Sequence, residues 1–210
     1  MDDYFEQGLL RFYSPHELRR LQNAVVGICG AGGIGSNCAI SLARSGIRHF
    51  VIADMDRVEW SNLNRQAYVS HHVGQYKVDA LTALLHSINP HITVVAHKER
   101  LTRDNLLRYM GDVHILVEAF DVVQSKVDFY EATHDLMIPR IMVSGIAGIG
   151  GVAPTQIKQL GENCYIVGDG ASGIDRLAPF APRVAMAANQ QADLVLALLL
   201  DKEVCHDILP

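Results

Sequence analysis

The sequence lacks several features that mark whole classes of protein. Its four cysteines form no CxxC pair, which argues against a disulfide framework and against a four-thiolate zinc site. No block of lysine and arginine offsets the formal charge of −5, so we expect no electrostatic surface for nucleic acid. The aliphatic run LVLALLL is far too short to span a bilayer, so no membrane segment is expected. A small molecule or another protein is the expected partner.

The chain also shows neither a targeting signal nor a linker. Its first residues, MDDYFEQGLL, are acidic and lack the basic-then-apolar order of a signal peptide, so we expect a cytoplasmic protein. Hydrophobic residues make up 49% of the chain, which can therefore bury a substantial core. Helix and strand signals continue without a linker-like stretch, and we predict a single domain over residues 1–210.

Apolar runs typical of buried strands alternate with amphipathic stretches typical of helices. This alternation predicts a Rossmann-like α/β fold, in which helices cover both faces of a doubly wound, mostly parallel sheet. After Ser144 the chain is glycine-rich with short alternating runs, which favours a short antiparallel or loop-rich extension before a closing helix over 184–203. The expected strands are 24–29, 47–56, 92–97, 114–120 and 139–145, and the expected helices are 14–23, 33–46, 74–90, 102–110 and 122–136.

A glycine-rich motif joins the first of these strands to the helix that follows. Gly30, Gly32 and Gly35 fill the GxGxxG pattern, in which glycine permits a tight turn and lets the backbone approach a phosphate. Asp54 ends the next strand, where a carboxylate commonly binds ribose hydroxyls. The alternatives are a tight structural turn and a loop or helix-capping carboxylate. The spacing of the two features favours nucleotide binding.

Two cations follow Asp54 and favour a triphosphate over a nicotinamide dinucleotide. Arg65 lies in the stretch SNLNRQ and Lys77 in GQYK. A guanidinium and an ammonium suit a polyphosphate, whereas hydride transfer needs room for nicotinamide and a substrate-side acid or base. Either cation taken alone is more often a solvated surface residue.

The motifs, taken in order, carry a family resemblance. The chain resembles the ThiF/MoeB-like adenylating enzymes, relatives of the ubiquitin-activating enzymes, and its short length and YIVGDG stretch are most similar to a compact second family of sulfur carrier protein ThiS adenylyltransferases. The resemblance implies ATP-dependent adenylation of the C-terminal glycine of a small ubiquitin-like sulfur carrier, with release of pyrophosphate, in thiamine biosynthesis. The motifs are GAGGIGS, DMDRVEWSNLNRQ, GQYKVDAL, INP and APRVAMAANQQA.

The resemblance also implies roles for individual residues. Arg65 and Lys77 would hold the phosphates, Asp121 would bind Mg²⁺ as a hard oxygen ligand, and Arg11 would reach the site of a partner subunit in a homodimer. Without the family, Asp121 is more often a helix cap than a metal ligand. The implied nucleotide contacts are Gly30, Gly32, Gly33, Gly35, Asp54, Asn64, Arg65 and Lys77.

The chain departs from the family pattern in ways that narrow the expected chemistry. Without CxxC pairs we predict no zinc, and because the stretch GDGASGIDRLAPFAP has no cysteine, we expect the activity to stop at adenylation. Cys164 and Cys205 are interpreted as structural thiols, since neither has an adjacent base or cation. Glu118 stands where relatives usually have Asp, and the Asn and Arg often found after Asp121 are absent, which puts the role of Asp121 in doubt.

Several alternatives remain open at this point. The enzyme could adenylate another sulfur carrier, of a molybdopterin or cysteine pathway. A tRNA-modifying relative is disfavoured, because the chain has no basic extension. An NAD-dependent oxidoreductase would explain the glycine motif and Asp54 alone. A catalytically silent scaffold that binds a ubiquitin-like partner would explain the altered surroundings of Asp121.

Overall fold

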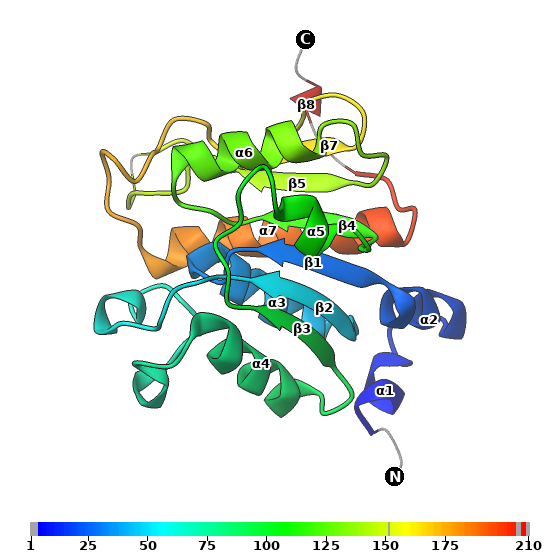
Figure 1. The fold of residues 1–210 in the computed structure, drawn as a ribbon. Helices are drawn as coiled ribbons and strands as arrows, with labels where there is room; N and C mark the ends of the chain where they lie inside the picture. The colour runs from blue at the N-terminus through cyan, green and yellow to red at the C-terminus, as the bar shows by residue number, and fades with distance from the viewer. Residues whose placement is uncertain (1–3, 151, 205–206, 209–210) are drawn as a thin grey trace.

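The computed structural model describes residues 4–150, 152–204 and 207–208, and it contains an eight-stranded sheet (Figure 1). The strand order is β3-β2-β1-β4-β5-β7-β6-β8. All neighbouring pairs are parallel except β6 with β7, which are antiparallel. The strands are β1 (Val25–Cys29), β2 (His49–Ala53), β3 (Thr93–His97), β4 (Ile115–Glu118), β5 (Arg140–Val143), β6 (Gln156–Gln159), β7 (Cys164–Gly168) and β8 (Asp207–Ile208).

Helices cover both faces of this sheet. In Figure 1, α5 and α6 lie in front of the sheet, and α3 and α7 lie behind it. The α-helices are α1 (Tyr4–Leu9), α2 (Pro15–Asn23), α3 (Gly33–Arg44), α4 (Lys77–Ile88), α5 (Leu106–Met110), α6 (Val123–Thr133) and α7 (Ala181–Leu199). Two short 3₁₀ turns, η1 (Trp60–Asn62) and η2 (Ser70–His72), lie between β2 and α4.

Successive residues of the central strands belong to two separate hydrophobic clusters. Ile28 packs with α3, α4 and α7, whereas its neighbour Cys29 packs with α5 and α6. The same alternation holds in β4, where Leu116 and Val117 belong to opposite clusters. Side chains alternate across a strand, so a strand buried on both faces reads as a continuous apolar run. This explains why the parallel strands were predictable from composition alone.

The predicted fold class is confirmed. The loop-rich extension is the antiparallel pair β6 and β7, and the closing helix is α7. Several helices are shorter than predicted, and α5 has the largest difference at its start, since it begins at Leu106 rather than near residue 102. The Asn105 side chain accepts a hydrogen bond from the Thr102 amide at 2.8 Å, which holds the first residues of this stretch in a turn. Within the described residues, no helix is long and apolar enough to cross a membrane.

Candidate functional site

A cleft of about 830 Å³ lies at the carboxyl ends of β1, β2, β4 and β5. The strand order reverses direction between β1 and β4, and in open α/β sheets ligands bind at such a switch point. Of the predicted site residues, the cleft lining includes Gly30, Gly32, Gly33, Asp54, Arg65, Lys77 and Asp121. It does not include Gly35, Asn64 or Arg11, whose positions are described below.

The glycine-rich turn brings the chain from β1 into α3 with almost no side-chain volume. Gly30 has a φ of 103°, a left-handed conformation that favours glycine. A Cβ atom at Gly35 would lie 1.8 Å from the Gly30 carbonyl oxygen, so the first turn of α3 can pack against the loop only with glycine there. Around Gly32 a Cβ would meet nothing closer than 4.0 Å. The missing side chain at Gly35 therefore allows α3 to pack against the turn. The missing side chain at Gly32 leaves open space beside the turn.

The first turn of α3 directs unpaired amides toward the cleft. Gly32 is the N-cap residue and supplies no side-chain cap, and the first intrahelical bond is donated by the Ser36 amide to the Gly32 carbonyl at 3.0 Å. The preceding amides of a helix have no intrahelical acceptor, and the helix dipole adds partial positive charge there. This end of α3 is therefore suited to a phosphate group.

Asp54 is bound to the glycine-rich turn and to its own loop. Its Oδ2 accepts the Ala31 amide at 2.7 Å, and its Oδ1 accepts the Asp56 amide at 2.8 Å. Burial raises the pKa of Asp54 above its ordinary value, and the Lys77 charge and the two backbone hydrogen bonds oppose this shift. Each carboxylate oxygen keeps a further lone pair for a hydroxyl donor, which fits the predicted ribose contact.

Lys77 has an ion-pair partner that the sequence did not reveal. Its Nζ lies 2.8 Å from Asp56 Oδ2, and only 9% of the Lys77 side chain is exposed. The Lys77 amide also donates to the Asp56 carbonyl at 2.9 Å, so the start of α4 is fixed to the loop after β2. The charge of Lys77 at this end of the cleft is therefore shared between Asp56 and any phosphate that binds.

Arg65 lines the cleft, and Asn64 connects it to a distant segment. Arg65 Nη1 donates to Asn64 Oδ1 at 2.8 Å and to the Ser61 carbonyl at 3.2 Å. The Asn64 amide nitrogen in turn donates to the Pro179 carbonyl at 3.3 Å. Asn37 of α3 donates to both the Gly33 and the Arg65 carbonyls, so the Arg65 backbone is fixed beside the first turn of α3. Asn64 thus orients Arg65 and lies outside the cleft lining.

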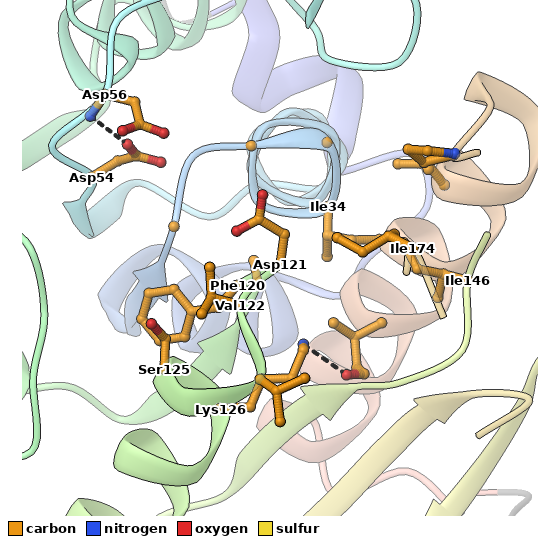
Figure 2. A pocket seen from close by; sticks show the side chains of 18 of the residues that line it. Ile34, Asp54, Asp56, Phe120, Asp121, Val122, Ser125, Lys126, Ile146 and Ile174 are labelled. Atoms are coloured by element: carbon orange, nitrogen blue, oxygen red, sulfur yellow. Dashed lines mark hydrogen bonds between the residues drawn. The ribbon is translucent and has the colours of Figure 1, made fainter. Parts of the chain in front are cut away.

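Asp121 follows β4 and points into the cleft. Figure 2 shows its carboxylate between Asp54 and Ile34, directed toward the glycine-rich turn. It does not cap α6, whose N-cap residue is Val122 without a side-chain hydrogen bond. No hydrogen bond or ion pair to another described residue engages its carboxylate, and Mg²⁺ in nucleotide sites typically takes one or two carboxylates plus phosphate oxygens. The residue fits that role, although no group of three or more potential ligands occurs among the described residues.

A buried ion pair forms the floor of the cleft below Asp121. Lys126 Nζ donates to both carboxylate oxygens of Glu118, at 2.8 Å and 3.1 Å, and to the Val143 carbonyl at 2.9 Å. Glu118 is fully buried and also accepts the Phe120 and Val143 amides. The pair therefore joins the ends of β4 and β5. The sequence analysis singled out Glu118 but missed Lys126, which was visible only as one cation in an amphipathic helix.

The opposite wall of the cleft is built from the segments that follow β5 and β7. The Gly170 amide donates to the Ser144 carbonyl at 3.1 Å, and the Ala147 amide donates to the Ser172 carbonyl at 2.9 Å. Wall residues that line the cleft are Ser144, Gly145, Ile146, Ser172, Gly173, Ile174 and Asp175. This wall is rich in small side chains and lies across the cleft from Asp54.

Arg11 lies far from the cleft of its own chain. It follows α1, which packs at the amino ends of the strands through the 2.8 Å ion pair between Glu6 and Arg48 (Figure 1). An N-terminal arginine here could serve a site only in another subunit, which is how the family resemblance assigned it. Cys29, Cys38 and Cys164 are buried, and burial raises the pKa of each thiol. Cys205 lies outside the described residues.

Comparison with known families places the chain. A model of the ThiF family matches residues 4–207. The chain belongs to the ThiF family. The glycine-rich turn, Asp54 and the segment with Arg65 and Lys77 all lie within the matched region.

Curated relatives of this ThiF-family chain carry different names. It is 33% identical to a tRNA threonylcarbamoyladenosine dehydratase of Haemophilus influenzae over 162 residues, 74% of this chain and 61% of the relative. It is 36% identical to ubiquitin-like modifier-activating enzyme 5 of Bombyx mori over 129 residues, 60% of this chain and 33% of the relative. It is 35% identical to a sulfur carrier protein adenylyltransferase of Thermus thermophilus over 122 residues, 58% of this chain and 45% of the relative. In each case the matched region spans less than two thirds of the relative.

Solved structures share the fold. The E. coli tRNA N6-threonylcarbamoyladenosine dehydratase TcdA superposes with a TM-score of 0.85 at 22% identity, covering 94% of this chain and 95% of TcdA. A TcdA complex with ATP superposes with a TM-score of 0.84, covering 95% of this chain and 96% of that one, at 23% identity. E. coli MccB with ATP superposes at 0.70 and 23% identity, covering 88% of this chain and 58% of MccB. The chain therefore shares its fold with TcdA and with MccB.

Proposed function

We propose that the protein is an ATP-dependent adenylating enzyme. Its substrate would be the C-terminal glycine carboxylate of a small ubiquitin-like sulfur carrier of the ThiS type, and its products an acyl-adenylate and pyrophosphate. One observation carries this proposal: a single cleft brings together the glycine-rich turn, Asp54, Arg65 and the unengaged Asp121. Relatives named as adenylyltransferases and neighbours crystallised with ATP support it.

The cleft offers a place for each part of ATP. Met55, Leu101 and Phe120 give the end near Asp54 an apolar lining that suits a purine. Asp54 would accept hydrogen bonds from the ribose hydroxyls. The amides at the start of α3 and the guanidinium of Arg65 would bind the phosphates.

The chemistry requires charge stabilisation rather than a general base. The attacking carboxylate is already ionised at neutral pH, and its oxygen forms a bond to the α-phosphorus while the bond to the pyrophosphate oxygen breaks. Negative charge grows on the leaving pyrophosphate, and Arg65 is positioned at the glycine-rich turn to stabilise it. Mg²⁺ held by Asp121 would supply further neutralisation of the phosphate charge when bound.

The carrier tail would lie along the opposite wall. Gly145 and Gly173 line that wall and have no side chains to fill the cleft. A narrow C-terminal tail needs little space between the walls. The formal charge of −5, without a block of lysine and arginine, disfavours nucleic acid as the substrate. The pathway, thiamine biosynthesis, stays a prediction, as do the cytoplasmic location, the single domain, the absence of zinc and the homodimer.

A second candidate is a carboxylate carried on tRNA. It is favoured by one observation: the sequence match covers 61% of the tRNA threonylcarbamoyladenosine dehydratase of Haemophilus influenzae but 45% of the carrier adenylyltransferase. A threonylcarbamoyl group carries a carboxylate, so the same activation chemistry would apply. The lack of a basic segment in this chain argues against RNA as the substrate.

ATP–pyrophosphate exchange tests the proposal. The assay contains Mg²⁺ and either a ThiS-like carrier ending in Gly-Gly or threonylcarbamoylated tRNA. We expect exchange that depends on the carrier and that falls at least tenfold, roughly 1.4 kcal/mol in the transition state, in Arg65→Ala and in Asp121→Ala. Arg103→Ala and Asp112→Ala are matched controls at exposed positions outside the cleft lining.

Other outcomes of this experiment identify the alternatives. Exchange with the tRNA alone would replace the carrier with the second candidate. Tight carrier binding without any exchange would establish a silent scaffold. NADH fluorescence that changes on titration, without exchange, would indicate an oxidoreductase.

A further inference from the structure

A buried ion pair outside the proposed nucleotide contacts joins the segments of the opposite wall. Asp169 follows β7 directly, and Arg183 lies in the first turn of α7. Arg183 Nη2 lies 2.6 Å from Asp169 Oδ2, and the two side chains are 11% and 1% exposed. A pair this buried is costly to desolvate, and the cost is offset by the hydrogen bonds that the pair makes, although the buried Nε of Arg183 has no partner among the described residues.

Asp169 organises the segment that follows it. Its Oδ1 accepts the Ala171 amide at 2.8 Å and the Ser172 amide at 2.7 Å, and its Oδ2 accepts the Ser172 hydroxyl at 2.5 Å. Burial by itself would raise the pKa of Asp169, but the hydrogen bonds from Ser172 and Ala171 and the Arg183 charge lower the pKa below its ordinary value. The carboxylate is therefore ionised at neutral pH and fixes the backbone up to Ser172, which lines the cleft.

Arg183 extends this network to the segment after β5. The Nη2 atom that contacts Asp169 also donates to the Ala153 carbonyl at 2.8 Å. Gly145 supplies a further constraint, because a Cβ there would lie 2.0 Å from Asp169 Oδ1. Gly145 has a φ of 73° and accepts the Asp169 amide at 3.0 Å through its carbonyl. Both segments of the wall therefore depend on the position of one carboxylate.

No residue of this pair lines the cleft, so its effect on chemistry must be indirect. We propose that Asp169 and Arg183 are positioning residues that hold the 144–148 and 169–178 segments in the shape that receives the acyl substrate. This inference rests on the proposed adenylation. It assigns the pair to use of the carboxylate substrate and not to binding of ATP, because the hydrogen bonds of the two side chains go to Ala153, Ala171 and Ser172 and not to the proposed ATP contacts.

Steady-state exchange kinetics with the Gly-Gly carrier test whether the pair affects use of the carrier without affecting the binding of ATP. Arg183→Met keeps the length of the side chain and removes its charge and donors. We expect its KM for the carrier to rise at least about tenfold while its Kd for ATP, measured by calorimetry, stays within about twofold of the wild-type value. Arg183→Lys should recover part of the loss, because an ammonium can reach Asp169 but cannot reproduce the planar fork of donors.

Two further variants keep the test informative. Arg176→Met is the matched control, since Arg176 belongs to the same segment but is 81% exposed and pairs only with its neighbour Asp175 among the described residues. Asp169→Asn combined with Arg183→Met should cost less than the sum of the two single changes, because both remove the ion pair between these residues. If Arg183→Met does not fold, Arg183→Lys and Ser172→Ala measure the same effect with smaller perturbations.

Hydrogen exchange followed by mass spectrometry tests the pair independently of any activity. In Arg183→Met, peptides covering 144–153 and 169–178 should exchange faster than in the wild type, and peptides covering the glycine-rich turn should not. Unchanged exchange in the wall would overturn the inference, as would equal losses of carrier and ATP affinity. A wild-type protein without adenylation activity would refute the proposed function, and faster wall exchange in the variant would still show that the pair holds the wall.

Discussion

Asp54 is bonded to two amides of its surroundings, and we predict that it also binds the ribose. We expect Asp54→Ala to weaken AMP binding by about 10- to 100-fold, since a hydrogen bond to a charged group contributes roughly 1.5–3 kcal/mol. Calorimetric titration with AMP measures this. Asp79→Ala, which removes an exposed partner of Lys98, is the control and should leave AMP affinity unchanged. Equal affinities in the two variants would contradict the ribose assignment.

Gly35 and Gly32 belong to the same motif, but we expect their replacement by alanine to have different effects. Gly35→Ala would place a Cβ 1.8 Å from the Gly30 carbonyl oxygen, so we expect it to destabilise the fold by about 3 kcal/mol. Gly32→Ala meets open space and should leave the unfolding free energy within about 0.5 kcal/mol while it reduces nucleotide affinity. Urea denaturation and AMP titration of both variants separate the two effects. If Gly32→Ala bound AMP normally, the phosphate would not lie above that residue.

At the scale of elements, α2 shows a stability device remote from the cleft. The Ser14 hydroxyl accepts the Glu17 amide at 3.2 Å and Glu17 Oε2 accepts the Ser14 amide at 3.0 Å, which is a capping box. Ser14→Ala should lower the unfolding free energy by about 1 kcal/mol without changing AMP affinity. Ser87→Ala in α4 is the control, because Ser87 only donates to the Ala83 carbonyl within its own helix. A loss of equal size in the control would show that the cap adds nothing.

The segment between β2 and α4 has a conformation that depends on hydrogen bonds to residues distant in the sequence. The Tyr68 hydroxyl donates to the Ala31 carbonyl at 2.7 Å, and the Ser36 hydroxyl accepts the Ala67 amide at 3.1 Å. These bonds fix the segment that carries Arg65 to the glycine-rich turn. Composition marks it only as a loop, since it holds no regular strand and only the short turns η1 and η2.

At the scale of the whole molecule, the predicted role of Arg11 in the site of a partner subunit can be tested with mixed dimers. If the protein is a homodimer in which Arg11 completes the partner's site, Arg11→Ala and Arg65→Ala should each abolish exchange. Mixing the two variants should then recover about a quarter of the wild-type activity, because half of the dimers would be mixed and each would contain one intact site. Exchange assays on mixed and separately incubated proteins measure this. A mixture that stays inactive although its subunits exchange would remove Arg11 from the site.

Sequence-based prediction succeeded where local pattern and tertiary structure agree. The doubly wound sheet follows from apolar runs that are buried on both faces, and the glycine-rich turn and Asp54 follow from their fixed places at the ends of β1 and β2. It did not reveal the partners of charged residues. Asp56 with Lys77, Glu118 with Lys126 and Asp169 with Arg183 are pairs whose members are 8 to 21 residues apart, and no periodicity marks them.

The sequence by itself determined the fold class, the glycine-rich turn and the candidate residues, because burial periodicity and glycine geometry act over short stretches of chain. Only the tertiary structure decided that Lys77 shares its charge with Asp56, that Asn64 orients Arg65 instead of lining the cleft, and that Asp121 is left without a partner among the described residues. The physical reason is that the energy of a charge depends on which charges and amides surround it, and the crossings of the sheet bring those groups together from distant parts of the chain.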